Sequence, residues 1–391
     1  MRKLRRRPIS LICPMSLVAL IALLGGCMRE PVLHLYDEAD LTMDLPVIDL
    51  DLEVYWDYEI AFGINYDWRA EWYYGWDDND SRIFGELGYT APTSFNLRRY
   101  YTAEVPYAPH TGVLASHIEG THFQGQYNWG FWDVLVWNDI KTIDGVQSLI
   151  FDEATSLDSV MAYTNQTMNS SRYQAPRYTR SFYAPEPLFS AYEQAIDISS
   201  DLKGFVYNEE RHAWVRTLQM VLQPITYIYL TQVIIHHNNG RITDVDGSAN
   251  LSGMARSTNL NTGRAGNDAI TVYYNVHLKN NCDMNGEPVD IVGGRLMTFG
   301  IPGNEANSLS RASDVYDKHN HYMDVHMQFY NGMDSTFVFN VTDQVRQRYK
   351  GGVITVELDM DTIPIPTRPG GSGFNAVVKE VEDGGTWEFE M

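Results

Sequence analysis

Histidine and carboxylate side chains gather late in the chain, where their spacing permits metal chemistry. His319 and His321 stand close enough to share one face of a strand. Further possible ligands nearby are Asp317, Asp324 and His326. Imidazole nitrogens and carboxylate oxygens are ligands that zinc takes from proteins. A His-Asn-His segment at a strand entry is more often a polar loop, and His236-His237 before a turn has the same interpretation. We therefore expect no metal site and no cofactor.

The usual catalytic motifs are absent from the sequence. Neither Gly-x-Ser-x-Gly nor a phosphate-binding Gly-x-x-x-x-Gly-Lys occurs, and Cys-x-x-Cys and His-Glu-x-x-His are missing too. Asp244 to Gly247 begins like a calcium loop, but the glutamate that would close the loop is lacking, so the segment is interpreted as a turn. The many carboxylates leave an acid and base pair open, although no spacing identifies one. The expectation is a protein that is not an enzyme.

The amino-terminal segment has the features of an export signal that ends in a cysteine. Basic residues from Arg2 to Arg7 precede the apolar stretch Ile9 to Leu24, which is shorter than the ~20 residues of a membrane span. Leu24-Gly25-Gly26-Cys27 follows and resembles a bacterial lipobox. The resemblance implies acylation of the Cys27 sulfur, cleavage before Cys27 and acylation of the freed amine. An uncleaved signal anchor or a chance cysteine is the alternative.

Several acyl chains such as palmitate on Cys27 would hold the protein at a membrane, because each buried methylene contributes about 0.8 kcal/mol. Residues 1–26 are then a signal peptide and residues 27–44 a tether. The expected location is the cell outer membrane, with the protein exposed at the surface or part of a fimbria. Cys282 is left as a free thiol, which suits a small buried side chain better than a nucleophile.

Composition restricts the partners further. The chain has 391 residues, 29 Lys and Arg against 50 Asp and Glu, and a net charge of −21. Such a charge repels phosphate backbones, so nucleic-acid binding is not expected. With 44% hydrophobic residues the chain can build cores of ordinary size without disulfides.

Period-two patterns indicate that the first half is a β domain. Leu45 to Ala61 begins with apolar residues at alternate positions and acidic residues between them. Seven of the nine tryptophans lie from Trp56 to Trp137, in short runs separated by Gly, Asn, Asp and Pro. Asp152 to Ala162 and Pro187 to Ile198 are expected to be short helices, the second because its apolar residues have helical spacing.

The second half also reads as strands and turns. Segments on both sides of Pro224 are apolar at odd and even positions, which predicts strands buried on both faces. Turns are expected at Asn238 to Gly240, closing a hairpin, and at Asn331 to Asp334. A short helix follows Thr342, and the last hairpin comes after a Pro- and Gly-rich linker. Further strands are expected at 269–278, 295–301, 321–330, 335–341 and 353–358.

The economical architecture is all-β, with two tandem β-sandwich domains after the signal and the tether. We place the N-terminal domain at residues 45–198 and the C-terminal domain, with its terminal hairpin, at residues 199–391.

Several sequence segments of the second half, together with the lipobox and the two β domains, resemble the fimbrillin-like lipoproteins of the Bacteroidales. These segments are Leu222 to Leu230, Ala249 to Ser257, Met297 to Ile301, Phe337 to Val345 and Gly385 to Phe389. The resemblance implies two transthyretin-like sandwiches and a role as a pilus anchor, accessory or tip subunit, or as a surface lipoprotein. The partners implied are other pilin subunits or ligands on host and bacterial surfaces.

The resemblance also implies assembly by β-strand complementation, in which one subunit's strand fills another's groove. In polymerising relatives a protease removes the first strand. A retained strand at about Val47 to Trp56, tied to Cys27, instead suits a membrane-anchored terminal subunit. The terminal hairpin can reach a partner or fold back on its own domain, and we favour the second because intrachain pairing has no association cost.

A glycan-binding surface lipoprotein is the alternative function, because exposed aromatic rings stack on sugars. The cluster Trp72, Tyr73, Tyr74 and Trp76 offers the best candidate ligand contacts. Aromatic residues also dominate sandwich cores, so core packing is the competing interpretation for these rings.

Overall fold

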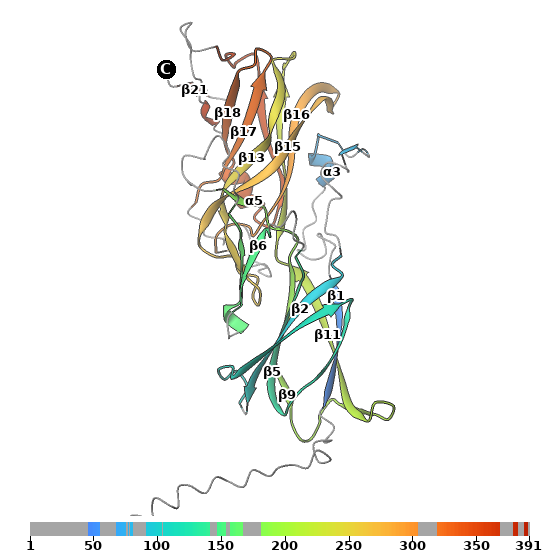
Figure 1. The fold of residues 1–391 in the computed structure, drawn as a ribbon. Helices are drawn as coiled ribbons and strands as arrows, with labels where there is room; N and C mark the ends of the chain where they lie inside the picture. Colours follow the sequence, from blue (N-terminus) through green and yellow to red (C-terminus); the bar gives the residue numbers. More distant parts are fainter. Residues whose placement is uncertain are drawn as a thin grey trace, which may run out of the picture.

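Two β-sheet bodies stacked end to end form an elongated molecule, which confirms the all-β, two-sandwich expectation (Figure 1). The computed structural model describes residues 46–54, 68–75, 77, 79–80, 91–103, 105–140, 147–153, 157–166, 181–303, 319–367, 378–381 and 387–389. The signal, the tether, Cys27 and Trp76 lie outside the described residues. Among the helices of the described residues, none is long and apolar enough to cross a membrane.

The first body is one curled sheet with the strand order β3-β2-β5-β9-β11-β1-β4, and β10 pairs with β11. The strands are β1 (Val47–Val54), β2 (Ser94–Ala103), β3 (Gly112–Glu119), β4 (His122–Gln126), β5 (Gly130–Asn138), β9 (Phe189–Ile198), β10 (Val206–Asn208) and β11 (Ala213–Pro224). Apolar residues on the inner faces, such as Ile48, Phe95 and Val134, are fully buried. Burial of these side chains is the main force that holds the sheet closed around its core.

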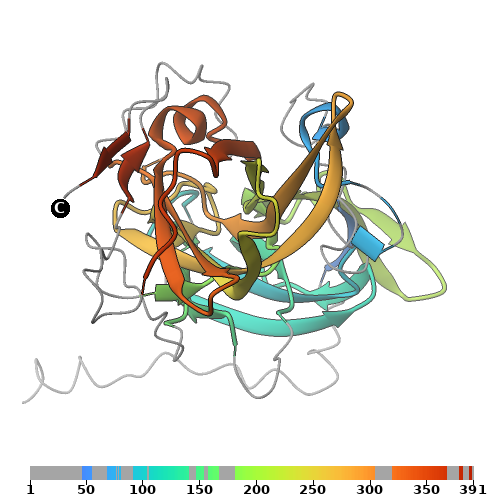
Figure 2. The same ribbon diagram turned by 90° about the horizontal axis from the view of Figure 1, so that it is seen from above.

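The second body has the strand order β19-β12-β16-β15-β13-β17-β18-β20-β21, and the short strand β8 pairs with β15. The elements are β8 (Ser181–Tyr183), β12 (Tyr227–His236), β13 (Ile242–Ala255), β15 (Ala269–Met284), β16 (Glu287–Thr298), β17 (Tyr322–Phe329), β18 (Asp334–Asn340), α5 (Thr342–Gln347), β19 (Gly352–Asp359), β20 (Val378–Val381) and β21 (Trp387–Phe389). β15 belongs to both layers, because its first half pairs with β13 and its second half with β16. Seen along the long axis, the strands curl around the interior (Figure 2).

A third, small sheet joins the two bodies. It consists of β6 (Leu149–Asp152), β7 (Met161–Thr164) and β14 (Ser257–Asn259), with the 3-10 turn η2 (Leu157–Ser159) beside it. Beneath it lies a separate core that includes Trp137 of the first body and Phe299 of the second. The segment between β5 and β9 therefore contacts the second body in two ways. Its strands β7 and β8 pair with β14 and β15, and its apolar side chains pack in the shared core.

The helix expected at Pro187 to Ile198 is wrong, because most of this segment is the strand β9. It pairs with β5 from Gly130 to Trp137, and a bulge at Ala195, where φ is 55°, interrupts the register. The carboxylate of Asp133 accepts a hydrogen bond from the Ala195 amide at 2.7 Å and fixes the bulge. The segment Asp152 to Ala162 likewise contains the end of β6, the 3-10 turn and the start of β7 in its described part.

The turn at Asn238 to Gly240 is present but closes no hairpin. β12 pairs with β16 and β19, whereas β13 pairs with β15 and β17, so the chain crosses from one layer to the other at this turn. The sheets also change at a different point from the boundary placed between residues 198 and 199. β10 and β11 remain in the first sheet, because β11 pairs along all of β1, and apart from β8 the second sheet is built from β12 onward.

The remaining hairpin and helix expectations agree with the structure. Asn331 to Asp334 turns β17 into β18, α5 begins at Thr342, and β19 follows as a strand. β20 and β21 form the terminal hairpin. β20 pairs in parallel with β18 through Phe337 and Val378, so the hairpin folds back on its own domain, as favoured from the sequence.

Candidate functional site

The direction of β1 sets the polarity of the molecule. β1 is parallel to β11, and β11 leads directly into β12 of the second body. β1 therefore begins at the end of the first body that points away from the second (Figure 1). β12 continues away from β11 and ends at His236, on the far side of the second body. At ~3.3 Å per strand residue, β11 and β12 together span on the order of 70 Å.

β1 occupies an interior slot of the first sheet. Val47–Val54 pairs with β11 along its whole length, and Val47 to Asp51 pairs with β4 on the other side. Its inward side chains Ile48 and Leu50 are fully buried. On the outer side Asp49 forms an ion pair of 2.9 Å with Arg211, and Asp51 lies 2.8 Å from His122 Nδ1. A strand expected at about Val47 to Trp56 is therefore present as β1 and is paired on both sides.

Open strand edges remain on the first body. β3 and β4 are the end strands of this sheet in the described residues. Val113 and Leu114 of β3 are 39% and 46% exposed, so the edge carries apolar side chains next to backbone groups that none of the described strands covers. Such an edge is a surface on which another chain can add a strand.

The aromatic segment proposed for ligand contact is largely buried instead. Trp72 and Tyr74 are 3% and 2% exposed, and their rings stack with centroids 5.6 Å apart. Tyr74 lies against Gly293 of β16, where an added Cβ would meet its ring, while Tyr73 is partly buried. Rings this covered have no free face for a sugar, so burial corrects the ligand-contact hypothesis for Trp72 and Tyr74. The core interpretation holds for both.

The same segment ties the first body to the β15–β16 hairpin. The short helix α3 (Trp68–Glu71) precedes it, and Glu71 forms an ion pair of 2.8 Å with Arg348 (Figure 1). The Tyr73 amide donates to Gln232 Oε1 at 3.0 Å, and Lys279 Nζ lies 2.7 Å from Asp80. Through these contacts the segment between β1 and β2 is a second connection to the second body, besides the segment between β5 and β9.

Cys282 lies beneath Tyr74 of this segment and has the buried position expected for it. Its thiol is 4% exposed and lies 3.9 Å from the Tyr74 carbonyl oxygen. Burial raises the pKa of Cys282 to about 11, with the nearby Lys279 acting in the opposite direction. The thiol is therefore protonated at neutral pH and is not an activated nucleophile.

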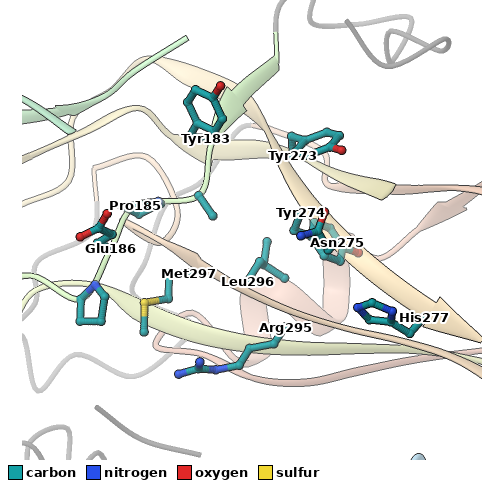
Figure 3. A pocket seen from close by; sticks show the side chains of 12 residues that line it. Tyr183, Pro185, Glu186, Tyr273, Tyr274, Asn275, His277, Arg295, Leu296 and Met297 are labelled. Atoms are coloured by element: carbon teal, nitrogen blue, oxygen red, sulfur yellow. The ribbon is translucent and has the colours of Figure 1, made fainter. Parts of the chain in front are cut away.

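A pocket of about 560 Å³ opens beside β8, β15 and β16 (Figure 3). Tyr183 and Tyr273, which are register partners on β8 and β15, stand on one side, and Arg295 lies across from them. Glu186 and His277 add further polar groups. Aromatic rings next to hydrogen-bonding side chains are the usual composition of a small-ligand pocket. Sequence reasoning missed this pocket because its residues come from three distant segments.

The histidines singled out from the sequence have separate environments. His321 is buried, and its Nδ1 lies 3.3 Å from the Ser252 carbonyl oxygen, while His326 Nε2 contacts Asp334 at 2.7 Å. Asp317 lies outside the described residues. His237, in contrast, lies 2.9 Å from Asp359, and this hydrogen bond raises the pKa of His237 and lowers that of Asp359.

No protein-family model and no curated protein matches the sequence. Solved structures do resemble the fold. A candidate adhesin from Bacteroides ovatus shares 12% identity, with a TM-score of 0.48 over 84% of this chain and 95% of the other. A second, from Bacteroides thetaiotaomicron, shares 11% identity, with a TM-score of 0.44 over 83% and 95%. The fimbrial anchor protein Mfa2 from Porphyromonas gingivalis shares 10%, with a TM-score of 0.36 over 80% and 90%.

Proposed function

We propose that the protein is a lipid-anchored subunit of the cell surface that acts in adhesion or in a fimbria and has no enzymatic chemistry of its own. The observation that carries the proposal is β1, which comes from the chain's own amino-terminal region and fills an interior slot of the first sheet. A subunit whose slot is filled by its own strand has no groove there for a neighbour's strand. Such a subunit belongs at the end of an assembly.

The polarity of the fold supports anchoring at the amino-terminal end. β1 begins at the end of the first body that points away from the second, close in sequence to Cys27. With Cys27 lipidated in the outer membrane, the second body would project outward. That arrangement presents the loops at the far end of β12 and β19 to partners outside the cell.

Contacts with other pilin subunits would use strand pairing. The open edge of β3 exposes Val113 and Leu114, and within the described residues β20 pairs with β18 through Phe337 and Val378. A sheet edge and a terminal hairpin are both places where another chain can add or exchange a strand. The proposal is that this hairpin or the β3 edge receives the next subunit.

Cross-linking in intact cells tests this function. A tagged protein, cross-linked at the surface and purified from solubilised membranes, is expected to bring down a major pilin or another surface subunit. A tagged outer-membrane lipoprotein of unrelated fold is the matched control. Recovery of the same proteins with both baits, or of none with this one, would reject the proposed assembly role.

Glycan binding remains a second candidate function, now supported by the pocket rather than by the buried rings. Tyr183 and Tyr273 offer aromatic faces, and Arg295 and Glu186 offer hydrogen-bonding groups around one hollow. Affinity gels or glycan arrays should show a sugar affinity that falls by up to about tenfold in Tyr273→Ala, since a stacked ring contributes about 0.5–1.5 kcal/mol beyond the area it buries.

Two further variants separate the pocket from the aromatic segment. Trp76→Ala, outside the described residues, tests the original aromatic candidate, and Trp72→Ala tests its buried neighbour. A sugar affinity lost in Trp76→Ala but kept in Tyr273→Ala would place the ligand at the aromatic segment. No affinity for any sugar would remove glycan binding altogether.

A further inference from the structure

The loops at the outer end of the second body bring one imidazole and two carboxylates together. His237 directly follows β12, Asp359 ends β19, and Asp361 lies in the turn that follows. β12 and β19 are parallel neighbours whose last register pair is His236 with Asp359, so both segments leave the sheet at the same point. Within the described residues, the ligand atoms of His237, Asp359 and Asp361 all lie within 4.8 Å of one another.

The separations match those between ligands on one metal ion. His237 Nδ1 lies 2.9 Å from Asp359 Oδ1 and 3.7 Å from Asp361 Oδ2. Two ligands on a tetrahedral zinc ion, with bonds of about 2.0–2.2 Å, are roughly 3.4 Å apart. The three side chains are 61%, 41% and 57% exposed, so small rotations can bring them to equal distances.

Neighbouring groups hold the two carboxylates in this orientation. Arg241 Nη2 lies 3.2 Å from Asp361 Oδ1, which leaves Oδ2 on the side of His237. Asp359 Oδ1 also accepts a hydrogen bond from the Asp361 amide at 3.0 Å. Contacts of this kind, which orient the ligands without touching the ion, are typical of metal sites. Arg241 is therefore a positioning residue for Asp361.

The charge balance favours a cation over a simple ion pair. An ion pair with His237 needs one carboxylate, yet two face the same nitrogen. Arg241 is paired with one of them, Asp361, and Glu287 is close enough to act on His237 electrostatically. Glu357 lies beside them, 3.2 Å from His236 Nε2. One imidazole nitrogen with two carboxylate oxygens suits zinc and similar transition metals, whereas calcium and magnesium take oxygen ligands.

We propose that His237, Asp359 and Asp361 form a binding site for a divalent transition-metal ion, with zinc as the representative ion. Three protein ligands leave at least one coordination position open. His237 also lines a hollow of about 750 Å³, together with Asn238, Asn281 and Glu287 among others. The site is independent of whether the protein belongs to a fimbria.

Isothermal titration of the purified protein with zinc chloride tests the proposal. We expect one equivalent to bind, with an affinity that falls more than about tenfold in His237→Ala and in Asp361→Asn. His236→Ala is the matched control, because His236 is the adjacent histidine and contacts Glu357 outside the triad. Cobalt(II) provides a second readout, since its visible absorption bands report ligation by the protein and should disappear in His237→Ala.

Three results would overturn the site. The first is a wild-type protein without saturable zinc binding. The second is a His237→Ala protein that binds zinc as tightly as the wild type does. The third is a His236→Ala protein that loses as much affinity as His237→Ala.

Discussion

Replacing Leu50 by aspartate is expected to abolish the cooperative folding of the first body. Leu50 is fully buried in β1, in a strand that is paired on both sides. An ionised carboxylate without a partner in an apolar core costs several kcal/mol, a large part of the ~5–15 kcal/mol that stabilises an ordinary domain. Urea denaturation followed by circular dichroism should show the transition of this body shifted to much lower urea or lost.

Glu53→Gln is the matched control for Leu50→Asp. Glu53 belongs to the same strand but is exposed, so its replacement should change the free energy of unfolding by no more than about 0.5 kcal/mol. A protein that lacks residues 45–56 should regain stability when a peptide of that sequence is added, because the slot between β11 and β4 is then filled again. Wild-type stability of Leu50→Asp would show that β1 is dispensable, and the terminal-subunit proposal would fall with it.

Replacing Cys27 by serine is expected to release the protein from the membrane. The acylation implied by the lipobox proceeds through the cysteine sulfur, and a hydroxyl cannot form the thioether. With no acyl chains, the membrane affinity contributed at about 0.8 kcal/mol per buried methylene is lost. Fractionation should find the variant as soluble protein or uncleaved precursor, and labelling with radioactive palmitate should give no signal.

Cys282→Ser serves as the control for that experiment. Cys282 is buried beneath Tyr74, far along the chain from the signal, so this variant should keep both the label and the membrane location. Radioactive lipid on the Cys27→Ser protein would contradict the assigned anchor. The lipid would then have to be attached to another residue.

Strands were predictable wherever burial on both faces left a continuous apolar run. Tyr227–His236 is such a run, and it forms a strand that is buried along nearly its whole length and paired on both sides. The turn at Asn331 was equally clear, because its flanking strands pair with each other. These features depend on residues close together in sequence, which local patterns can report.

The wrong predictions concern strands and pairings that depend on residues far away in the sequence. Pro187 to Ile198 has apolar residues at helical spacing, but pairing with β5 and the bulge at Ala195 make most of it a strand. At Asn238 the turn is visible in the sequence, whereas the sheets that β12 and β13 join depend on β16, β19, β15 and β17. Tertiary context overrides local spacing in both cases.

The candidate sites were less predictable than the strands for the same reason. Trp72 and Tyr74 stand out as a local cluster, yet the absence of a side chain at Gly293 is what allows Tyr74 to be buried there. His237 was visible, but Asp359 is 122 positions away and only the parallel pairing of β12 with β19 brings the two together.

The parallel pairing of β1 with β11 determines how the protein would respond to mechanical force. A pull between the amino-terminal end of β1 and the far end of β12 acts along the strands, in opposite directions on β1 and β11. The hydrogen bonds between them are then loaded in shear, all at once, and cannot be unzipped one by one. Forced unfolding is governed by the rate of crossing the barrier. In the proposed role at a cell surface, the protein would resist the pull of flowing liquid better because of the orientation of its first strand.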